Sequence, residues 1–220
     1  GNFGTRTVPV ASAGRYIYAK GSEMLPYLFS KDDRNILIHQ SFEGAAIEPR
    51  FLLPVIPTIF VNGNRGVSSG FSQLIGQREI KEIIKILVLR LQGKILNFDD
   101  FNSLPLYYNG FEGNITRDPE VTDKFRWILD GTFEHLPKTK ANSKGAILIT
   151  ELPPETKLIT YIQFLDSLQE DKKIKSFKDE CNGDSWQFRV QLNHEMDASQ
   201  IIKLFKLRSF VTENFTCLGS

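Results

Sequence analysis

The sequence has few of the residues that build metal centres and disulfide frameworks. Its 220 residues include 2 cysteines and 3 histidines, all isolated along the chain, so zinc-ligand spacing and a disulfide scaffold are both excluded. No apolar run approaches the roughly 18 residues of a membrane helix. The longest, 51–61, is broken by Pro54 and Pro57. A secretory signal is also missing, which together with two lone cysteines favours a reducing, cytoplasmic setting.

Apolar residues are nevertheless plentiful enough for a sizeable core. They make up 41% of the chain against 24% charged residues, which excludes intrinsic disorder. The length fits one large domain or two small ones. Because the first residue is glycine rather than methionine, we expect a processed chain or a piece of a longer one.

Charge is unevenly distributed along the chain. Up to Lys94 there are 12 lysines and arginines against 7 aspartates and glutamates, and from Ile95 onward 15 against 19, for a net charge of +1. A basic first half beside an acidic second half indicates a polyanion contact confined to the first half. Charge alone fits chance variation in an ordinary protein equally well.

Helical periodicity is clearest in 78–92. Its apolar residues recur at three- and four-residue spacing opposite charged ones, and Gly93 follows where a helix would end. The segments 157–169 and 199–207 also predict helices. A shorter helix is expected within 22–29, with Ser22 as N-cap and Pro26 in the first turn.

Other segments predict extended backbone, and together with the helices they indicate an α+β fold. We expect strands or strand edges at 16–18, 35–39, 131–134, 146–151, 186–192 and 210–218, and a loop at 104–113. The prolines in 48–63 favour extended backbone at a sheet edge. Since neither a parallel βαβ rhythm nor an internal repeat is present, the class is mixed α+β.

Two local motifs could carry chemistry. The glycine-rich segment 62–70 lacks the pattern of a P-loop or a Rossmann turn, and on spacing alone it is a turn, although Arg65 beside its glycines could meet a phosphate. The pair Arg15-Tyr16 follows a run of small residues. A lone tyrosine is usually structural, but an adjacent guanidinium can stabilise a phenolate and the charge on a phosphate under attack.

Taken together, the segments resemble the cleavage core of type IIA DNA topoisomerases, with the T-even-type phage medium subunits most similar and the eukaryotic enzymes next. The resemblance covers nearly the whole chain. Its motifs, in the family's order and spacing, are Gly1 to Arg6, Ala11 to Ile17, Glu48-Pro49, Pro54 to Thr58, Val61 to Gly63, Gly66-Val67, Gly70 to Ser72, Leu104-Pro105, Gly110 to Gly113, Ile149 to Pro153 and Leu204 to Leu207.

This resemblance implies roles for individual residues. Tyr16 matches the nucleophile that becomes linked to the 5′ end of cut DNA, and Arg15 matches the arginine at the scissile phosphate. Val67 stands where the family usually has an isoleucine that wedges between base pairs. Three further residues would lie along the DNA path: Arg6, Asn62 and Arg65. Gly14 departs from the proline or alanine usual before the Arg-Tyr pair.

The resemblance also implies an architecture and partners. Residues 1–51 would form the C-terminal part of a winged-helix domain carrying the catalytic tyrosine, and 52–220 a mixed α/β tower domain. Mg²⁺ and ATP would be bound by regions or subunits absent from this chain, so no metal ligand is assigned. Asp32-Asp33 and Asp99-Asp100 are interpreted as solvated turn residues. Expected partners are double-stranded DNA, the ATPase and metal-binding subunit or domain, and a second copy of the subunit, with no membrane contact.

The predicted function is that of a DNA cleavage and religation core. The parent enzyme would break both strands through a phosphotyrosyl link, pass another duplex with ATP and reseal, in the host cytoplasm if phage-encoded, while the isolated fragment would be inactive. Two alternatives stay open. One is a non-catalytic DNA-binding and bending module in which Tyr16 is structural, and the other is a protein-interaction domain that uses the acidic half.

Overall fold

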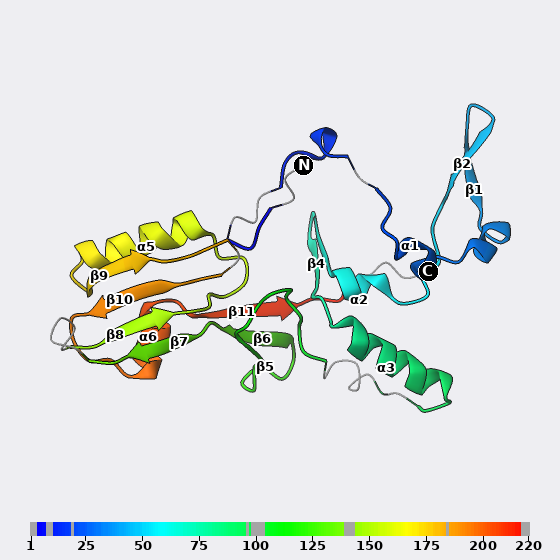
Figure 1. The fold of residues 1–220 in the computed structure, drawn as a ribbon. Helices are drawn as coiled ribbons and strands as arrows, with labels where there is room; N and C mark the ends of the chain where they lie inside the picture. The colour runs from blue at the N-terminus through cyan, green and yellow to red at the C-terminus, as the bar shows by residue number, and fades with distance from the viewer. Residues whose placement is uncertain are drawn as a thin grey trace. The chain divides into compact units, whose positions relative to one another are not determined.

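The computed structural model describes residues 4–7, 11–18, 20–95, 97, 104–138, 144–183 and 185–216 (Figure 1). The chain divides into two compact units. The first, which we name the sheet unit, joins Gly1–Ile17 to Tyr108–Asn214, and the second, the hairpin unit, joins Tyr18–Tyr107 to Phe215–Ser220. This division by contacts does not fall at residue 51, and the assignment of 1–51 and 52–220 to two domains stays a prediction.

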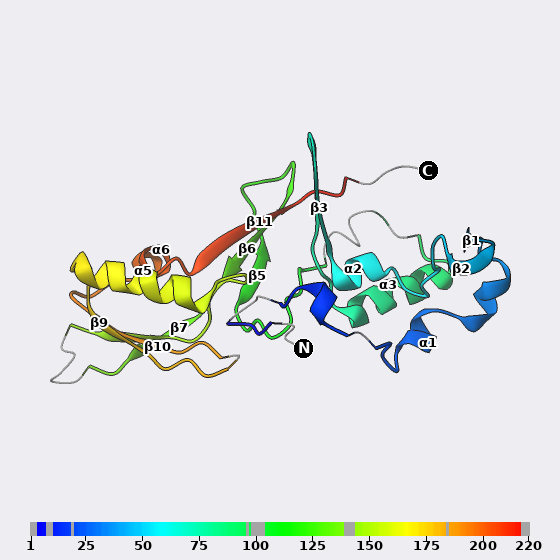
Figure 2. The same ribbon diagram turned by 90° about the horizontal axis from the view of Figure 1, so that it is seen from above.

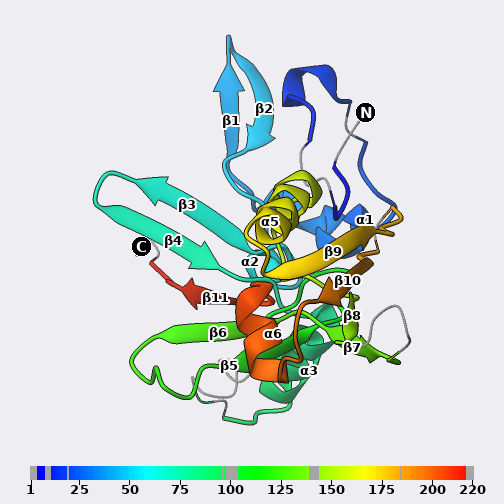
Figure 3. The ribbon, with the colours of Figure 1, turned by 90° about the vertical axis from the view of Figure 1, so that its left-hand side faces the viewer.

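A four-stranded antiparallel sheet carries the core of the sheet unit. Its strand order is β7-β8-β10-β9, and both α5 and α6 lie on one side of it (Figure 3). Ile147 pairs with Val190 and Ile149 with Phe188, so their side chains share the face on which the helices pack. The bounds are β7 Phe133–Leu136, β8 Ala146–Ile149, α5 Leu158–Glu170, β9 Ile174–Asp179, β10 Phe188–Leu192 and α6 Ala198–Leu204.

A second sheet of the same unit has the order β11-β6-β5, with β5 at Asn114–Arg117, β6 at Phe125–Asp130 and β11 at Arg208–Glu213. Trp127 of β6 is buried, and its Nε1 donates a 2.7 Å hydrogen bond to the buried Glu213 carboxylate. Between β6 and β7 the backbone passes so close to Glu151 that a Cβ on Gly131 would lie 2.3 Å from the Glu151 carbonyl oxygen. Only glycine fits there, and it joins the two sheets tightly.

The hairpin unit is built from short helices and two separate two-stranded ribbons, β1-β2 and β3-β4 (Figures 1 and 2). Arg78 is its main buried polar residue: the side chain is 2% exposed and Nη1 donates to the Gly76 and Gln77 carbonyls at 3.1 and 3.3 Å. The bounds are α1 Leu25–Leu28, η2 Lys31–Asn35, β1 His39–Phe42, β2 Ala45–Pro49, α2 Thr58–Asn62, β3 Asn64–Ser68, β4 Phe71–Ile75 and α3 Ile80–Leu91.

Several sequence predictions are confirmed. The three periodic segments are helices α3, α5 and α6, and the segment 104–113 contains no helix or strand. Strands occupy half of 131–134 and most of 146–151 and 186–192. All paired strands among the described residues are antiparallel, in agreement with the α+β class. In that described part, no helix combines the length and apolar character that a membrane crossing requires.

Other predictions are wrong. The segment 16–18 is not a strand, because Tyr16 closes a short 3-10 turn, and most of 35–39 precedes β1. Within 48–63, the residues after Pro57 form helix α2 instead of extended backbone. Met24, not Ser22, is the N-cap of α1; Ser22 contributes its carbonyl oxygen, which accepts from the Leu25 amide at 3.1 Å. Strands β3, β4, β5, β6 and β9 were not predicted. Asp99-Asp100 lies outside the described residues.

Candidate functional site

Arg15 and Tyr16 lie on an exposed 3-10 turn, η1, at Gly14–Tyr16. The Tyr16 amide donates to the Ala13 carbonyl at 2.9 Å and the Ile17 amide donates to the Gly14 carbonyl at 3.2 Å, so the turn is held by its own backbone. The Tyr16 side chain is 75% exposed. Its hydroxyl therefore has open access to a large substrate, which the buried tyrosine of a core would not have.

Arg15 supplies a positive charge beside that phenol. The central carbon of its guanidinium lies 6.0 Å from the centroid of the Tyr16 ring. A planar guanidinium at this range can reach an oxyanion that approaches the phenol oxygen and can donate two parallel hydrogen bonds to it. The pair thus offers a hydroxyl nucleophile together with a group that stabilises negative charge on the atom it attacks.

Arg6 belongs to the same unit but has a partner within the protein. Its guanidinium forms an ion pair with the carboxylate of Glu151, and the two side chains are 22% and 2% exposed. The Glu151 carboxylate also accepts hydrogen bonds from the amides of Glu112, at 2.9 Å, and Leu152, at 2.8 Å. From the sequence, Glu151 was recognised only as part of the motif 149–153 and received no role, although a glutamate directly after a buried strand was a usable signal.

Val67 and Arg65 lie on the β3-β4 hairpin of the hairpin unit. Cross-strand pairing places Val67 opposite Ser72 and Arg65 opposite Leu74. Because residues two apart share a strand face, Arg65 and Val67 project from one face of the ribbon. The Val67 side chain is 86% exposed. The segment 62–70 is thus largely a strand and its hairpin turn, and its interpretation as a simple turn is wrong.

Asn62 and Gly63 connect α2 to this hairpin. The Asn62 carbonyl accepts a 3.0 Å hydrogen bond from Gln77 Nε2. Gly63 has φ of +67°, and a Cβ there would lie 2.9 Å from the Ile75 carbonyl oxygen. Glycine is therefore required at position 63, where the chain enters β3 close to the end of β4. This glycine turn also positions Asn62.

The six predicted site residues thus divide between the two units. Arg6, Arg15 and Tyr16 belong to the sheet unit, and Asn62, Arg65 and Val67 to the hairpin unit. Their roles stay predictions.

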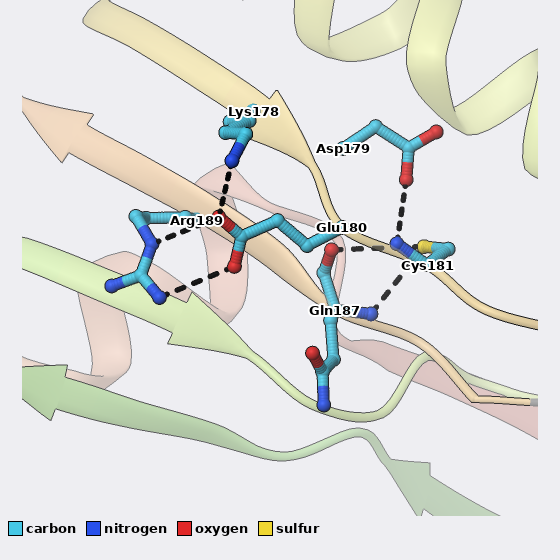
Figure 4. Close-up of polar contacts among 6 residues, drawn as sticks. All are labelled: Lys178, Asp179, Glu180, Cys181, Gln187 and Arg189. Carbon is cyan, nitrogen blue, oxygen red and sulfur yellow. Dashed lines mark hydrogen bonds and ion pairs between the residues drawn. The ribbon is translucent and has the colours of Figure 1, made fainter.

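Cys181 is another nucleophilic side chain of the sheet unit, but its surroundings suppress its reactivity. Partial burial, with the Asp179 carboxylate nearby, raises the pKa of the thiol to about 12, against the opposing effect of the Gln187 backbone. The sulfur accepts from the Gln187 amide at 3.3 Å, and the Cys181 amide donates to Asp179 at 2.9 Å (Figure 4). A protonated, engaged thiol is a poor nucleophile at neutral pH.

Beside Cys181, charged side chains neutralise one another. Arg189 donates to both carboxylate oxygens of Glu180 at 3.2 Å, and Lys178 lies 3.2 Å from the same carboxylate (Figure 4). Hydrogen bonds from Arg189 and Lys178 lower the pKa of Glu180. The cluster is an exposed ion-pair network on the sheet and offers no free acid or base.

Comparison with known proteins identifies the family. A family model that describes the A-type subunits of DNA gyrase and topoisomerase IV matches residues 1–218. DNA topoisomerase 2 of Arabidopsis thaliana is 31% identical over 96% of this chain and 14% of its own length. The DNA topoisomerase medium subunit of Enterobacteria phage T4 is 30% identical over 100% of this chain and 47% of its own length.

A solved structure agrees with these relatives. The crystal structure of the Plasmodium falciparum topoisomerase II DNA-binding, cleavage and re-ligation domain superposes with a TM-score of 0.75 and 28% identity, over 96% of this chain and 28% of that one. Fold and motifs define a cleavage core of the type IIA topoisomerase class. The chain belongs to the family of the DNA gyrase and topoisomerase IV A-type subunits. The chain spans about one seventh of the length of the Arabidopsis enzyme and about one half of the length of the phage T4 medium subunit.

Proposed function

We propose that this chain carries the DNA-cleaving centre of a type IIA topoisomerase, with Tyr16 as the nucleophile. The observation that carries the proposal is the exposed Tyr16 side chain beside the Arg15 guanidinium, on a turn of a chain that belongs to this family. The substrate is double-stranded DNA. The names of the relatives and of the similar crystal structure support this choice of substrate.

The reaction is a transesterification. The Tyr16 oxygen loses its proton and attacks a backbone phosphorus, forming a phosphotyrosyl bond to the 5′ side of the break. The bond from phosphorus to the 3′ oxygen breaks, and that oxygen takes up a proton as the leaving hydroxyl. One phosphoester replaces another, so the reverse attack by the 3′ hydroxyl reseals the strand without an energy source.

Arg15 stabilises the charge that builds on the phosphate oxygens during attack. Its donors are fixed in a planar fork that matches two oxygens of a phosphate, and removing a group of this kind costs about 100- to 1000-fold in rate in other enzymes. Arg65, Asn62 and Arg6 are proposed to line the DNA path. Val67 would insert between base pairs and bend the duplex, since an exposed apolar side chain on a narrow ribbon fits a base step.

The complete enzyme is proposed to use Mg²⁺ and ATP, both bound outside this chain. Among the residues that the structure describes, no three histidines, cysteines or carboxylates gather into a group that could hold a metal ion. The described residues therefore do not provide a metal site of their own. The partners are a metal-binding and ATPase subunit or domain and a second copy of the subunit, with 1–51 as winged-helix tail and 52–220 as tower domain. A cytoplasmic setting and an inactive isolated fragment complete the proposal.

The decisive experiment replaces Tyr16 by phenylalanine in the complete subunit, together with its metal-bearing partner. Tyr16→Phe removes one hydroxyl, so covalent protein–DNA adducts trapped on a denaturing gel should disappear, while DNA affinity is retained. Tyr18→Phe is the matched control: Tyr18 is 99% exposed and two residues away, and its adduct yield should equal that of the wild type.

Each outcome separates the candidate functions. Adducts that persist in Tyr16→Phe would overturn the assignment of the nucleophile. If the wild-type assembly binds and bends DNA but yields no adduct under any condition, the non-catalytic bending module is the correct function.

A further inference from the structure

Three separate segments of the sheet unit meet at the carboxylate of Glu151. Its two oxygens accept from the Glu112 amide, just before β5, and from the Leu152 amide, just after β8. The third segment is the N-terminal one, which brings the guanidinium of Arg6. Two amide donors and one guanidinium satisfy a buried charge that would otherwise be costly.

The backbone of Glu151 is as firmly held as its side chain. Its amide donates to the Thr132 carbonyl at 3.2 Å, and its carbonyl accepts from the Thr132 amide at 3.1 Å. The close approach of Gly131 leaves no space for the backbone to shift toward it. The carboxylate is therefore a fixed point of the sheet unit, set by its two sheets.

The segment that ends in Tyr16 is attached to this fixed point. Thr7, directly after Arg6, is 6% exposed, its hydroxyl donates to the Gly183 carbonyl at 2.9 Å, and its carbonyl accepts from the Leu158 amide at 3.1 Å. The turn that carries Tyr16 has an internal backbone hydrogen-bond pattern. The shape of this turn is thus local.

We infer that Glu151, acting through Arg6, is a positioning residue for Tyr16. This inference rests on the proposed function. The ion pair fixes residues 4–7, from which the chain continues to the turn of Tyr16, so that the Tyr16 oxygen is presented at a defined point to the phosphate. In a displacement reaction, a misplacement of about 1 Å can cost about 100-fold in rate. Arg6 would then contribute to cleavage through placement, and this role replaces the contact with DNA proposed for it above.

The test changes Arg6, because removing Glu151 would leave two amides without an acceptor, that of Leu152 being buried, and could unfold the unit. Arg6→Gln in the complete subunit, together with its metal-bearing partner, removes the charge but keeps a donor. Arg6→Lys keeps the charge but loses the planar fork. The matched control is Arg208→Gln, which breaks another arginine–carboxylate pair of the same unit, with Arg208 Nε 2.6 Å from Asp130 Oδ1.

Three measurements are made on each variant: the single-turnover rate of adduct formation at saturating DNA, the salt dependence of DNA affinity, and hydrogen exchange at the Leu158 amide, which donates to the Thr7 carbonyl. For Arg6→Gln we expect the rate to fall about 10- to 100-fold, because the nucleophile is misplaced. Exchange at the Leu158 amide should accelerate, and the dependence of DNA affinity on salt concentration should stay unchanged. Arg6→Lys should recover part of the rate, and Arg208→Gln should match the wild type.

Two results would overturn the inference. One is an unchanged rate for Arg6→Gln at saturating DNA, together with a slope of log DNA affinity against log salt concentration that is smaller by about one. That result marks a lost phosphate contact and makes Arg6 a DNA ligand. The other is an equal loss of rate in Arg208→Gln, which marks general destabilisation. Both require a wild-type assembly that forms adducts, so failure of the proposed function is recognised separately, by the absence of adducts from the wild type.

Discussion

The two units of this chain bury their apolar residues to very different degrees. In the sheet unit, strands β8 and β10 and helix α5 contribute fully buried side chains such as Leu165 and Phe188 to one cluster. Among the described residues of the hairpin unit, the buried apolar side chains are Ile75, Ile83, Leu104 and Leu106. The first unit has a core of its own, whereas the second presents much of its apolar surface to its surroundings.

Helices α3 and α5 make the comparison concrete. Both are amphipathic and of nearly equal length, at Ile80–Leu91 and Leu158–Glu170. In α5 the apolar face is covered by a sheet. In α3 Ile83 is buried, but Ile80, Ile84, Val88 and Leu91 are 41%, 44%, 44% and 87% exposed. A similar pattern thus stabilises the fold in one unit and leaves apolar surface in the other. Five of the six predicted site residues are likewise exposed, since a side chain cannot both fill a core and meet a substrate, and the sixth, Arg6, is half-buried.

The largest expected effect comes from leucine truncations in these two helices. Leu165→Ala, at 0% exposure, should lower the free energy of unfolding by about 2–5 kcal/mol, because it opens a cavity in the core. Leu91→Ala should change it by less than about 0.5 kcal/mol. Urea unfolding of the whole chain, followed by circular dichroism, measures both. Equal losses would mean that the exposed face of α3 is covered in solution.

A smaller effect is expected for the hairpin. Val67→Ala should leave the free energy of unfolding within about 0.5 kcal/mol of the wild type, because the side chain is exposed. It should reduce the angle by which saturated duplex DNA is bent, since unstacking a base step costs a few kcal/mol and the apolar contact that offsets this cost is lost. Fluorescence transfer between the DNA ends measures the angle.

The control for the hairpin variant is Val55→Ala, which removes the same atoms from another exposed position of the hairpin unit, at 66% exposure. It should leave the bend unchanged. Identical angles for the wild type and Val67→Ala would reject the wedge.

The smallest effect concerns Cys181 and alkaline pH. Its folded pKa of about 12 lies above the ordinary 9.0, so the fold favours the protonated thiol. This contribution to stability is fully present below pH 9.0 and declines as the pH rises toward 12, because only the unfolded chain then ionises freely. In a Cys217→Ser background, the urea midpoint should fall between pH 9 and pH 11 slightly more steeply with Cys181 than with Cys181→Ala. If the urea midpoints of the two proteins fall in parallel with pH, the pKa of the Cys181 thiol is not raised in the folded chain.

Local pattern determined a large part of this protein. The spacing of apolar residues was enough to predict α3, α5 and α6, because an apolar stripe at three- and four-residue spacing is the pattern of an amphipathic helix. In 186–192 apolar and polar residues alternate. This alternation predicted β10, because successive side chains of a strand point to opposite faces. The order of motifs along the chain was enough to indicate the family, which the comparisons then confirmed.

The tertiary structure decided what depends on residues far apart. In strand β6 the buried Trp127 and Leu129 lie two residues apart, but Ile128 between them is also apolar, so the pattern alone is ambiguous. Pairing with β5 and β11 on its two sides makes this run a strand. Glu151 and Arg6 lie far apart in the sequence, and no local pattern indicates that they form an ion pair. Local pattern also does not indicate that the apolar face of α5 is buried and that of α3 largely exposed. A periodic sequence specifies that a stripe is apolar, but only the arrangement of the other elements determines whether anything covers it.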